Sequence, residues 1–502
     1  MSLFLESAPI ARRPLLVLSA LWLTAAAPPE AIDGSTPEPQ SPSADRTIRE
    51  GPEETPDDPY VFVPAASRVT SPGLRVVLGR HTSVQVNVDD LGMNIVGDAA
   101  NEPSIAIDPN DRRRIAIGWR QFDTITSNFR QAGVGTSDDG GATWSTDVIE
   151  PGVFRSDPVL DWNADGTFFY NSLNGGLRCE VFRSGDAGVT WDSGVSAFGG
   201  DKQWMVIDRT EGAGAGHIYA AWWPAGGCCF PNMLTRSRDA GASYETPVEV
   251  GDGLRRGTLS VGADGAVYAA GHHPDDLGRI QVGKSINAGT DTVPATFDQV
   301  VDVPLGGPIV RAAGPNPGGL LGQIGVFADP SDADRVYVLS SVDPPGTDPL
   351  DIYFARSTDG GVTWDPPVRI NDDPTDNGAW QWFGTLSVAP SGRIDALWAD
   401  SRADPDGFDS VIYHAFSVDA GVTWSANEPL TPPFDPQLGY PNQSKIGDYY
   451  ESISFDDAVH LAYAATFNGE QDVYHLHFTP LDALFRDGFE SGDLAGWSAT
   501  SP

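Results

Sequence analysis

The sequence predicts an all-β protein, a β-propeller built from four-stranded antiparallel blades. Three observations lead to this prediction: a short polar motif recurs along the chain, an apolar hairpin precedes each copy, and an alternating segment near the N-terminus has no local partner. Units that recur about every 45 to 65 residues are typical of propeller blades, and their number predicts seven blades, with six as the alternative.

The recurring motif has the form S-x-D-x-G-x-[TS]-[WY] and predicts a hairpin turn. Its copies lie at residues 137–144, 184–191, 237–244, 357–364 and 417–424, and an eroded copy at 285–289 has Asn287 in place of the aspartate. The aspartate can accept hydrogen bonds from turn amides, the glycine permits a positive φ, and the aromatic residue can pack into the core. The residues predicted to play this structural role are Asp139, Trp144, Asp186, Trp191, Asp239, Tyr244, Asp359, Trp364, Asp419 and Trp424.

An apolar hairpin precedes each motif and supplies two further strands. The first copy has strands at 104–107 and 114–119 around the turn 108–113. The other copies run approximately over residues 158–171, 204–222, 257–270, 323–340, 384–398 and 452–466. One hairpin and the two strands that flank a motif together make a four-stranded blade.

The last unit lacks a fourth strand, and the N-terminal part of the chain can provide it. After its hairpin, this unit continues with a third strand at 472–478 but has no motif. Residues 82–88 alternate in polarity ahead of the first unit. They are predicted to pair with the last unit and close the ring, which removes the exposed edges.

Residues 1–27 have the order of a secretory signal peptide: Arg12 and Arg13, an apolar run from Leu15 to Leu23, then small residues. The run is too short to span a bilayer, so we expect no membrane insertion after cleavage and a secreted protein, extracellular or periplasmic. Residues 28–79 are predicted to be a disordered linker rich in proline, serine and acidic residues, residues 80–480 the propeller, and residues 481–502 a C-terminal tail without assigned function.

The composition narrows the choice of partners. With 31 basic and 69 acidic residues, the formal net charge of −38 repels nucleic acid. We expect a monomer without a cofactor. Cys179, Cys228 and Cys229 lie in equivalent loops of neighbouring units, which favours one disulfide across the rim and leaves one cysteine over. No zinc-ligand spacing accompanies them, so no metal is predicted.

The motif resembles the Asp-box, or bacterial neuraminidase repeat, over roughly residues 80 to 478. Propellers with this repeat include sialidases, other glycosidases and proteins without catalysis. The resemblance implies a sialidase-like site with an arginine cluster for the sugar carboxylate, a tyrosine nucleophile assisted by a glutamate, and an aspartate as acid and base. The Arg-Ile-Pro tripeptide of that family is replaced here by residues 101–105, and seven blades differ from the six of its catalytic domain.

The candidate site follows from the topology. If the motifs lie on one face, the opposite face carries the loops between second and third strands and those between blades. Aromatic, basic and carboxylate side chains in these loops are typical of sugar sites. The predicted catalytic residues are Tyr449, Glu102, Asp157 and Asp448, and the predicted substrate-binding residues are Arg120, Arg255, Arg256, Arg402, Trp119, Asp201, Lys202 and Trp380. The structural alternatives are that Tyr449 packs at the axis and that Glu102 and Asp157 bind loop amides.

Two functions remain open on the sequence alone. One is a secreted glycoside hydrolase of the exo-α-sialidase type that acts on terminal sugars of glycans. The other is a non-catalytic propeller that binds glycan or protein on its loop-rich face. A further Asp-box glycosidase would need two carboxyl groups that face each other across the axis. Convergence of three arginines opposite a tyrosine and a glutamate would favour the sialidase.

Overall fold

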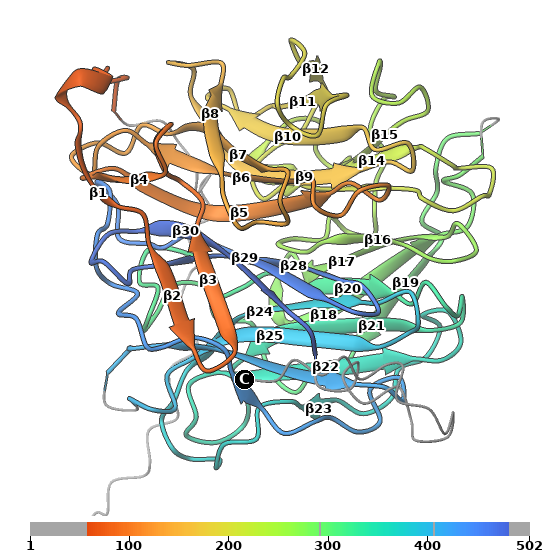
Figure 1. The fold of residues 1–502 in the computed structure, drawn as a ribbon. Coiled ribbons are helices and arrows are strands. Elements are labelled where there is room, and N and C mark those ends of the chain that lie inside the picture. The colour runs from red at the N-terminus through yellow and green to blue at the C-terminus, as the bar shows by residue number, and fades with distance from the viewer. Residues whose placement is uncertain (1–57, 291–292, 405–406, 481–502) are drawn as a thin grey trace, which may run out of the picture. The chain divides into compact units, whose positions relative to one another are not determined.

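A computed structural model of the chain describes residues 58–290, 293–404 and 407–480 (Figure 1). The predicted signal peptide, most of the predicted linker and the predicted C-terminal tail lie outside the described residues. Residues 58–79 were predicted to be disordered, and this is wrong, because they contain a 3₁₀ turn η1 (Ala65–Ser67) and strands β1 (Val69–Pro72) and β2 (Arg75–Leu78). No helix within the described residues is long and apolar enough to cross a bilayer.

The fold is an all-β propeller of seven blades, as the sequence predicts. Blade 1 comprises β5 (Ala99–Ile107), β6 (Ile115–Phe122), β7 (Gln131–Ser137) and β8 (Ser145–Ile149). Blade 2 comprises β9 (Arg155–Trp162), β10 (Phe168–Asn174), β11 (Cys179–Ser184) and β12 (Val195–Ser196). Blade 3 comprises β13 (Trp204–Ile207), β14 (Ile218–Ala221) and β15 (Leu234–Ser237). A short 3₁₀ turn, η2 (Pro224–Gly226), follows β14.

Blades 4 to 6 have four strands each: β16 (Leu259–Val261), β17 (Val267–His273), β18 (Asp276–Ser285) and β19 (Gln299–Val303); β20 (Gly325–Ala328), β21 (Val336–Val342), β22 (Asp351–Ser357) and β23 (Val368–Arg369); and β24 (Gln381–Val388), β25 (Ile394–Asp400), β26 (Val411–Ser417) and β27 (Glu428–Pro429). Each of blades 1 to 6 is an antiparallel meander in which consecutive strands pair. Blade 3 has three strands, and a single bridge between Leu234 and Val248 takes the place of its fourth.

Blade 7 closes the ring with strands from both parts of the chain. It comprises β28 (Glu451–Ser454), β29 (Val459–Ala465) and β30 (Asp472–Phe478), followed by β3 (His81–Gln85) and β2. Ser83 pairs with Leu476 and Gln85 with Tyr474, so the predicted closing strand is confirmed. The remaining short strand, β4 (Met93–Val96), pairs with β1 in a separate two-stranded sheet.

Each predicted motif forms the same turn directly after the third strand of its blade. In the first copy, Ser137 Oγ accepts from the Gly141 N–H at 2.9 Å, and Asp139 accepts from the Thr143 N–H at 3.0 Å and from the Thr143 hydroxyl at 2.7 Å. The other four copies repeat these bonds. Hydrogen bonds from Thr363 are the main reason why the pKa of Asp359 falls to about 2.

The aromatic residue of a turn packs against the preceding blade. The Trp144 ring lies 5.4 Å from that of His475 in blade 7, and the Trp424 ring lies 5.1 Å from that of Phe354 in blade 5. Trp144 is buried. These contacts join neighbouring sheets, which explains why the motif requires an aromatic side chain at this position.

The repeat turns all lie on one face of the ring. Gly140 of the first turn donates to the Arg113 carbonyl, which lies in the turn between the first two strands of the same blade, and Gly360 makes the equivalent bond to Asp334. We call this the turn face. The loops between second and third strands, and those between blades, lie on the opposite, loop-rich face.

Candidate functional site

The innermost strands of several blades carry the same backbone distortion. Register shifts in β5, β9 and β24 fall at Glu102, Asp157 and Phe383, whose φ angles are 54°, 48° and 54°. Lys202 and Arg256, just before β13 and β16, have φ of 56° and 58°. Left-handed backbone is uncommon for residues other than glycine, and bulges of this kind re-aim a side chain. Strained backbone at these positions therefore directs particular side chains toward the axis.

Seven charged side chains meet on the loop-rich side of the axis, and we call them the axial charge cluster: Glu102, Arg120, Asp157, Asp201, Lys202, Lys445 and Asp448. Lys445 Nζ lies 3.2 Å from Glu102 and 2.9 Å from Asp448, and Arg120 Nε lies 3.2 Å from Glu102. Lys202 pairs with Asp448, with Asp201 at 3.5 Å and with Asp157 at 3.8 Å. The cluster ties blades 1, 2, 3 and 7 together.

The axial charge cluster is closed to solvent. Its side chains are at most 6% exposed. Burial raises the pKa of Glu102 to about 8, although Arg120 and Lys445 oppose the shift. Charges buried this deeply are tolerated because they are paired and hydrogen-bonded with one another.

A segment between blades 4 and 5, residues 313–322, covers the cluster. Asn316 donates to the Gly447 carbonyl at 2.8 Å and accepts from the Ile446 N–H at 3.0 Å. The Leu320 N–H donates to Asp448 at 2.7 Å. These bonds hold the segment over the charges, so the predicted catalytic carboxyls have no open path to the loop-rich face.

Tyr449 lies between the cluster and the interior of the ring. Its hydroxyl donates to the Pro158 carbonyl at 2.6 Å, and its ring meets the edge of Trp204 at 5.6 Å. Burial, with the nearby Glu102 and Asp157 carboxyls, raises the pKa of Tyr449 well above its usual value. A tyrosine in this state is a poor nucleophile until its surroundings change.

The four predicted arginines have different partners. Arg120 belongs to the axial charge cluster, whereas Arg402 pairs with Asp400 at 2.8 Å and with Asp372 at 2.6 Å, outside the cluster. Arg255 and Arg256 lie over the Trp223 ring, at 5.7 Å and 5.2 Å. Arg256 also contacts His272, whose pKa burial lowers to about 4. Of the two predicted tryptophans, Trp119 is buried in the core and Trp380 is partly buried beside Gly314.

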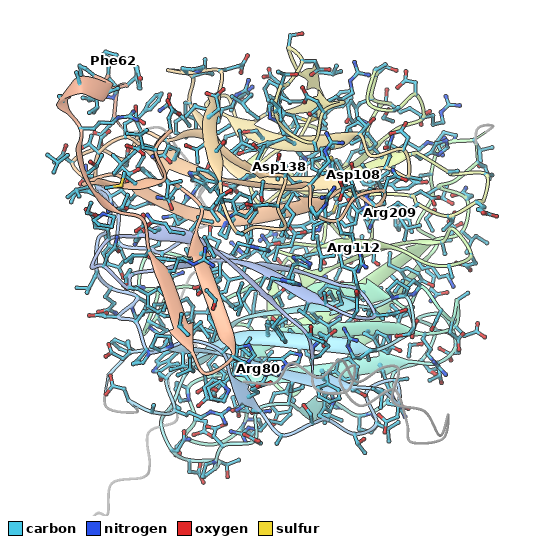
Figure 2. All side chains as sticks on the ribbon, in the orientation of Figure 1. Phe62, Arg80, Asp108, Arg112, Asp138 and Arg209 are labelled. Atoms are coloured by element: carbon cyan, nitrogen blue, oxygen red, sulfur yellow. A yellow bond between two sulfur atoms is a disulfide. The ribbon has the colours of Figure 1, made fainter. Side chains whose placement is uncertain are left out.

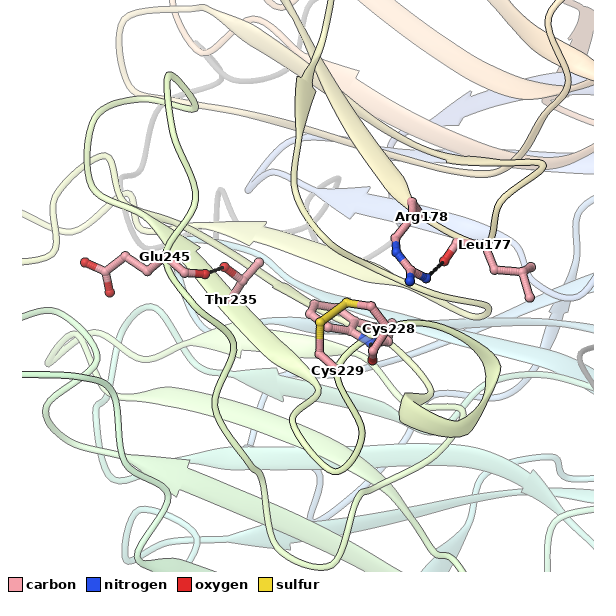
Figure 3. The surroundings of a disulfide bond; sticks show 7 residues. Leu177, Arg178, Cys228, Cys229, Thr235 and Glu245 are labelled. Carbon is pink, nitrogen blue, oxygen red and sulfur yellow. Dashed lines mark hydrogen bonds between the residues drawn. A yellow bond between two sulfur atoms is a disulfide. The ribbon is translucent and has the colours of Figure 1, made fainter.

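The disulfide joins Cys228 to its neighbour Cys229, as Figure 3 shows. The predicted bridge across the rim is therefore wrong. Cys179 is a buried free thiol with Sγ 3.9 Å from the Gly200 carbonyl oxygen, and burial raises its pKa. Equivalent loops of neighbouring blades did not bring these sulfurs together, because Cys179 packs inward at the start of β11.

A cavity of about 720 Å³ lies along the axis beyond Tyr449, and we call it the axial cavity. It is lined by the innermost strands of blades 2 to 7. Its wall combines aromatic rings and hydroxyl groups, namely Trp162, Trp204, Phe327, Phe383, Tyr449, Tyr450, Phe455, Thr258, Ser260, Thr385, Ser387, Ser452 and Ser454.

The axial cavity opens on the turn face. Its lining residues at that end, including Arg209, Glu211 and Pro330, are exposed, whereas Phe383 and Tyr449 at the other end are buried. Figure 2 labels Arg209 together with Asp108 and Asp138, two residues of the turns on this face. The cavity thus lies on the side opposite to the one where the sequence placed a site.

Apart from Tyr449, the lining residues were not assigned to a site from the sequence, because inner-strand side chains were attributed to packing. Glu451 is one of them: its carboxyl accepts the Ser104 hydroxyl and, at 3.0 Å, the Ile105 N–H. Burial raises its pKa to about 8. Its place at the start of the last inner strand, two residues after Tyr449, was the available signal.

No family model and no curated protein matches the chain. Among solved structures, Trypanosoma rangeli sialidase in complex with the inhibitor DANA is 12% identical, with 83% of this chain and 62% of that chain covered and a TM-score of 0.36. The endosialidase of phage phi92 is 9% identical, with 80% and 69% covered and a TM-score of 0.42. A fungal alcohol oxidase in complex with copper is 10% identical, with 82% and 77% covered and a TM-score of 0.48. At such identities and TM-scores these structures indicate nothing about the activity of this chain.

Proposed function

We propose that this protein is a carbohydrate-binding propeller that admits the end of a neutral glycan into its axial cavity from the turn face and does not hydrolyse it. The observation that carries the proposal is the composition of the cavity wall. Aromatic rings such as Trp204 and Phe327 can cover the apolar face of a sugar ring, and serine and threonine hydroxyls can bind its hydroxyl groups.

Two features of the carboxyl groups favour binding over hydrolysis. Glycoside hydrolysis needs two carboxyl groups that reach the same sugar bond. Glu102, Asp157 and Asp448 are paired inside the closed axial charge cluster. Within the cavity, Asp161 is held by Arg209 and by the Ile207 N–H at 2.7 Å, and Glu211, the remaining carboxyl besides Glu451 among the described lining residues, lies exposed at the mouth.

Titration of the protein with neutral and sialylated oligosaccharides tests this proposal. We expect saturable binding of a neutral oligosaccharide, no release of sugar, and binding at least about tenfold weaker in Trp204→Ala. Trp204→Phe, which keeps a ring, should retain most of the affinity and guards against a folding defect. Phe230→Ala is the matched control, because Phe230 is an exposed aromatic residue of the loop-rich face. Loss of binding in Phe230→Ala but not in Trp204→Ala would contradict a site in the axial cavity.

A sialidase-like glycosidase is the second candidate, and one observation favours it. Glu102, Asp157 and Arg120 lie close enough to Tyr449 to shift its pKa, so the residue types expected of a sialidase do gather at the axis. Activity would require residues 313–322 to move away from the loop-rich face. Turnover of a fluorogenic sialoside by the wild type, lost in Tyr449→Phe, would establish this function and displace the first.

We further propose that the chain is exported and acts as a monomer. The order of charged, apolar and small residues in residues 1–27 supports export. Mass spectrometry of protein recovered outside the cytoplasm should find a mature N-terminus close to residue 28, and light scattering should give the mass of one chain. An intact N-terminus on cytoplasmic protein would contradict export.

A further inference from the structure

The inner strands of neighbouring blades are joined by a repeated hydrogen bond. A side chain at one position of the inner strand accepts from a backbone N–H of the next blade around the ring. Three residues make it: Ser104 accepts from Leu160 at 2.7 Å, Thr258 from Val326 at 2.9 Å, and Glu451 from Ile105 at 3.0 Å. In blades 1 and 4 a single hydroxyl oxygen is enough for this purpose.

The carboxyl group of Glu451 has a second oxygen that the repeated hydrogen bond does not use. Its Oε2 receives both the Ile105 N–H and the Ser104 hydroxyl. No described residue hydrogen-bonds Oε1, and the side chain lines the axial cavity. A carboxyl group held rigidly through one oxygen presents the other in a fixed position, which is the arrangement of a ligand-binding group.

The charges around Glu451 do not favour an anionic ligand. Asp161 and Arg209 face it from blades 2 and 3, and they are paired with each other. Tyr449 and Tyr450 precede it on its own strand, and Glu211 lies at the mouth of the cavity. Among the described lining residues, Arg209 is the cation, and Asp161 already neutralises it. A sugar carboxylate would therefore enter beside carboxyl groups without a free positive partner.

We infer that Glu451 binds a hydroxyl group of the ligand through Oε1 and makes the axial cavity select uncharged sugars over carboxylated ones. This inference rests on the proposed function, because it concerns the ligand of the same cavity. Glu451 acts as a specificity-determining residue.

The ionisation of Glu451 gives the inference a distinctive pH dependence. Burial raises the pKa of Glu451 to about 8, and Asp161 adds to the shift, whereas the bonds from Ser104 and Ile105 oppose it. Below this pH the group is a neutral carboxylic acid that can donate to a hydroxyl. Above it the group is a carboxylate that repels a sugar carboxylate. Discrimination against carboxylated sugars should therefore increase as the pH rises through about 8.

The experiment compares the affinities of a neutral oligosaccharide and its sialylated counterpart at about pH 6 and about pH 9.5. In the wild type, we expect the ratio of the two affinities to increase about tenfold between these pH values. Glu451→Gln keeps an acceptor for the Ile105 N–H and cannot ionise, so its ratio should stay constant. Glu249→Gln removes an exposed carboxylate outside the axial cavity and should behave like the wild type.

The outcomes separate this inference from the proposed function. If the wild type binds neither oligosaccharide, the proposed function fails. If it binds the neutral one and the ratio is independent of pH, or follows pH equally in Glu451→Gln, the role of Glu451 is wrong while the binding site stands. Equal or tighter binding of the sialylated sugar at either pH would also overturn the inference.

Discussion

At the scale of the residue, one carboxylate organises each repeat turn. Asp139 accepts from two backbone N–H groups and from the hydroxyl groups of Ser137 and Thr143. We expect Asp139→Ala to lower the free energy of unfolding by about 1–2 kcal/mol, because these donors lose their acceptor. Asp138→Ala is the matched control, since its side chain is exposed beside the same turn. Equal effects of the two substitutions in urea unfolding would contradict this role.

Lys202 is the residue on which the axial charge cluster depends most. Its ammonium group faces Asp157, Asp201 and Asp448, and none of its side chain is exposed. We expect Lys202→Met to destabilise the protein by about 3–5 kcal/mol, because it leaves buried carboxylates without their cation. Adding Asp448→Asn should recover part of this loss. An additive loss in the double variant would show that the charges act independently.

At the scale of the element, closure of the ring depends on β3. It pairs with β30 and thereby covers the edge of blade 7. A chain that starts at residue 58 should melt like the full chain, whereas one that starts at residue 88 should melt at a lower temperature and associate through the exposed edge. Scanning calorimetry and light scattering measure both effects. Equal melting temperatures would contradict closure by this strand.

The junction between β5 and β30 holds two buried carboxyl groups that interact. Burial and mutual repulsion raise the pKa of Asp98 well above its usual value, and burial raises that of Asp472 to about 7. The folded state therefore holds protons that the unfolded state releases from about pH 4 upward, so this junction loses stability as the pH rises toward 7 and beyond.

Asp98→Asn should reduce that loss. It keeps an acceptor for Gln121, which donates to Asp98 at 3.0 Å, and it removes the repulsion. We expect the free energy of unfolding of the variant, measured in urea relative to that of the wild type, to be about 1 kcal/mol higher at about pH 8 than at about pH 5. The same difference at both pH values would rule out the carboxyl pair as its origin.

The elements were predictable from the sequence because their signals are local. The five turns carry their own hydrogen-bonding residues, and the alternation of residues 82–88 revealed β3. The start of ordered structure at residue 58 was not predicted, because β1 pairs with β4 across the intervening β2–β3 hairpin and β2 joins the sheet of blade 7 only through β3.

At the scale of the whole molecule, the repeat correctly brought Glu102, Asp157, Lys202 and Asp448 toward the axis. The repeat could not reveal that these charged groups pair with one another, because the directions of their side chains depend on left-handed backbone at residues in or just before the inner strands. Nor could it reveal the axial cavity, whose size depends on the packing of six blades. The pairing of Cys228 with Cys229 was missed for a different reason, because the disulfide joins adjacent residues within one loop and the symmetry of the blades says nothing about it.

We expect the ligand to enter the axial cavity from the turn face. A crystal structure of the protein with a neutral oligosaccharide tests this most directly. We expect a sugar ring against Trp204, with a hydroxyl group within hydrogen-bond distance of the Glu451 carboxyl. Sugar bound on the loop-rich face, above residues 313–322 or within an opened axial charge cluster, would contradict the account.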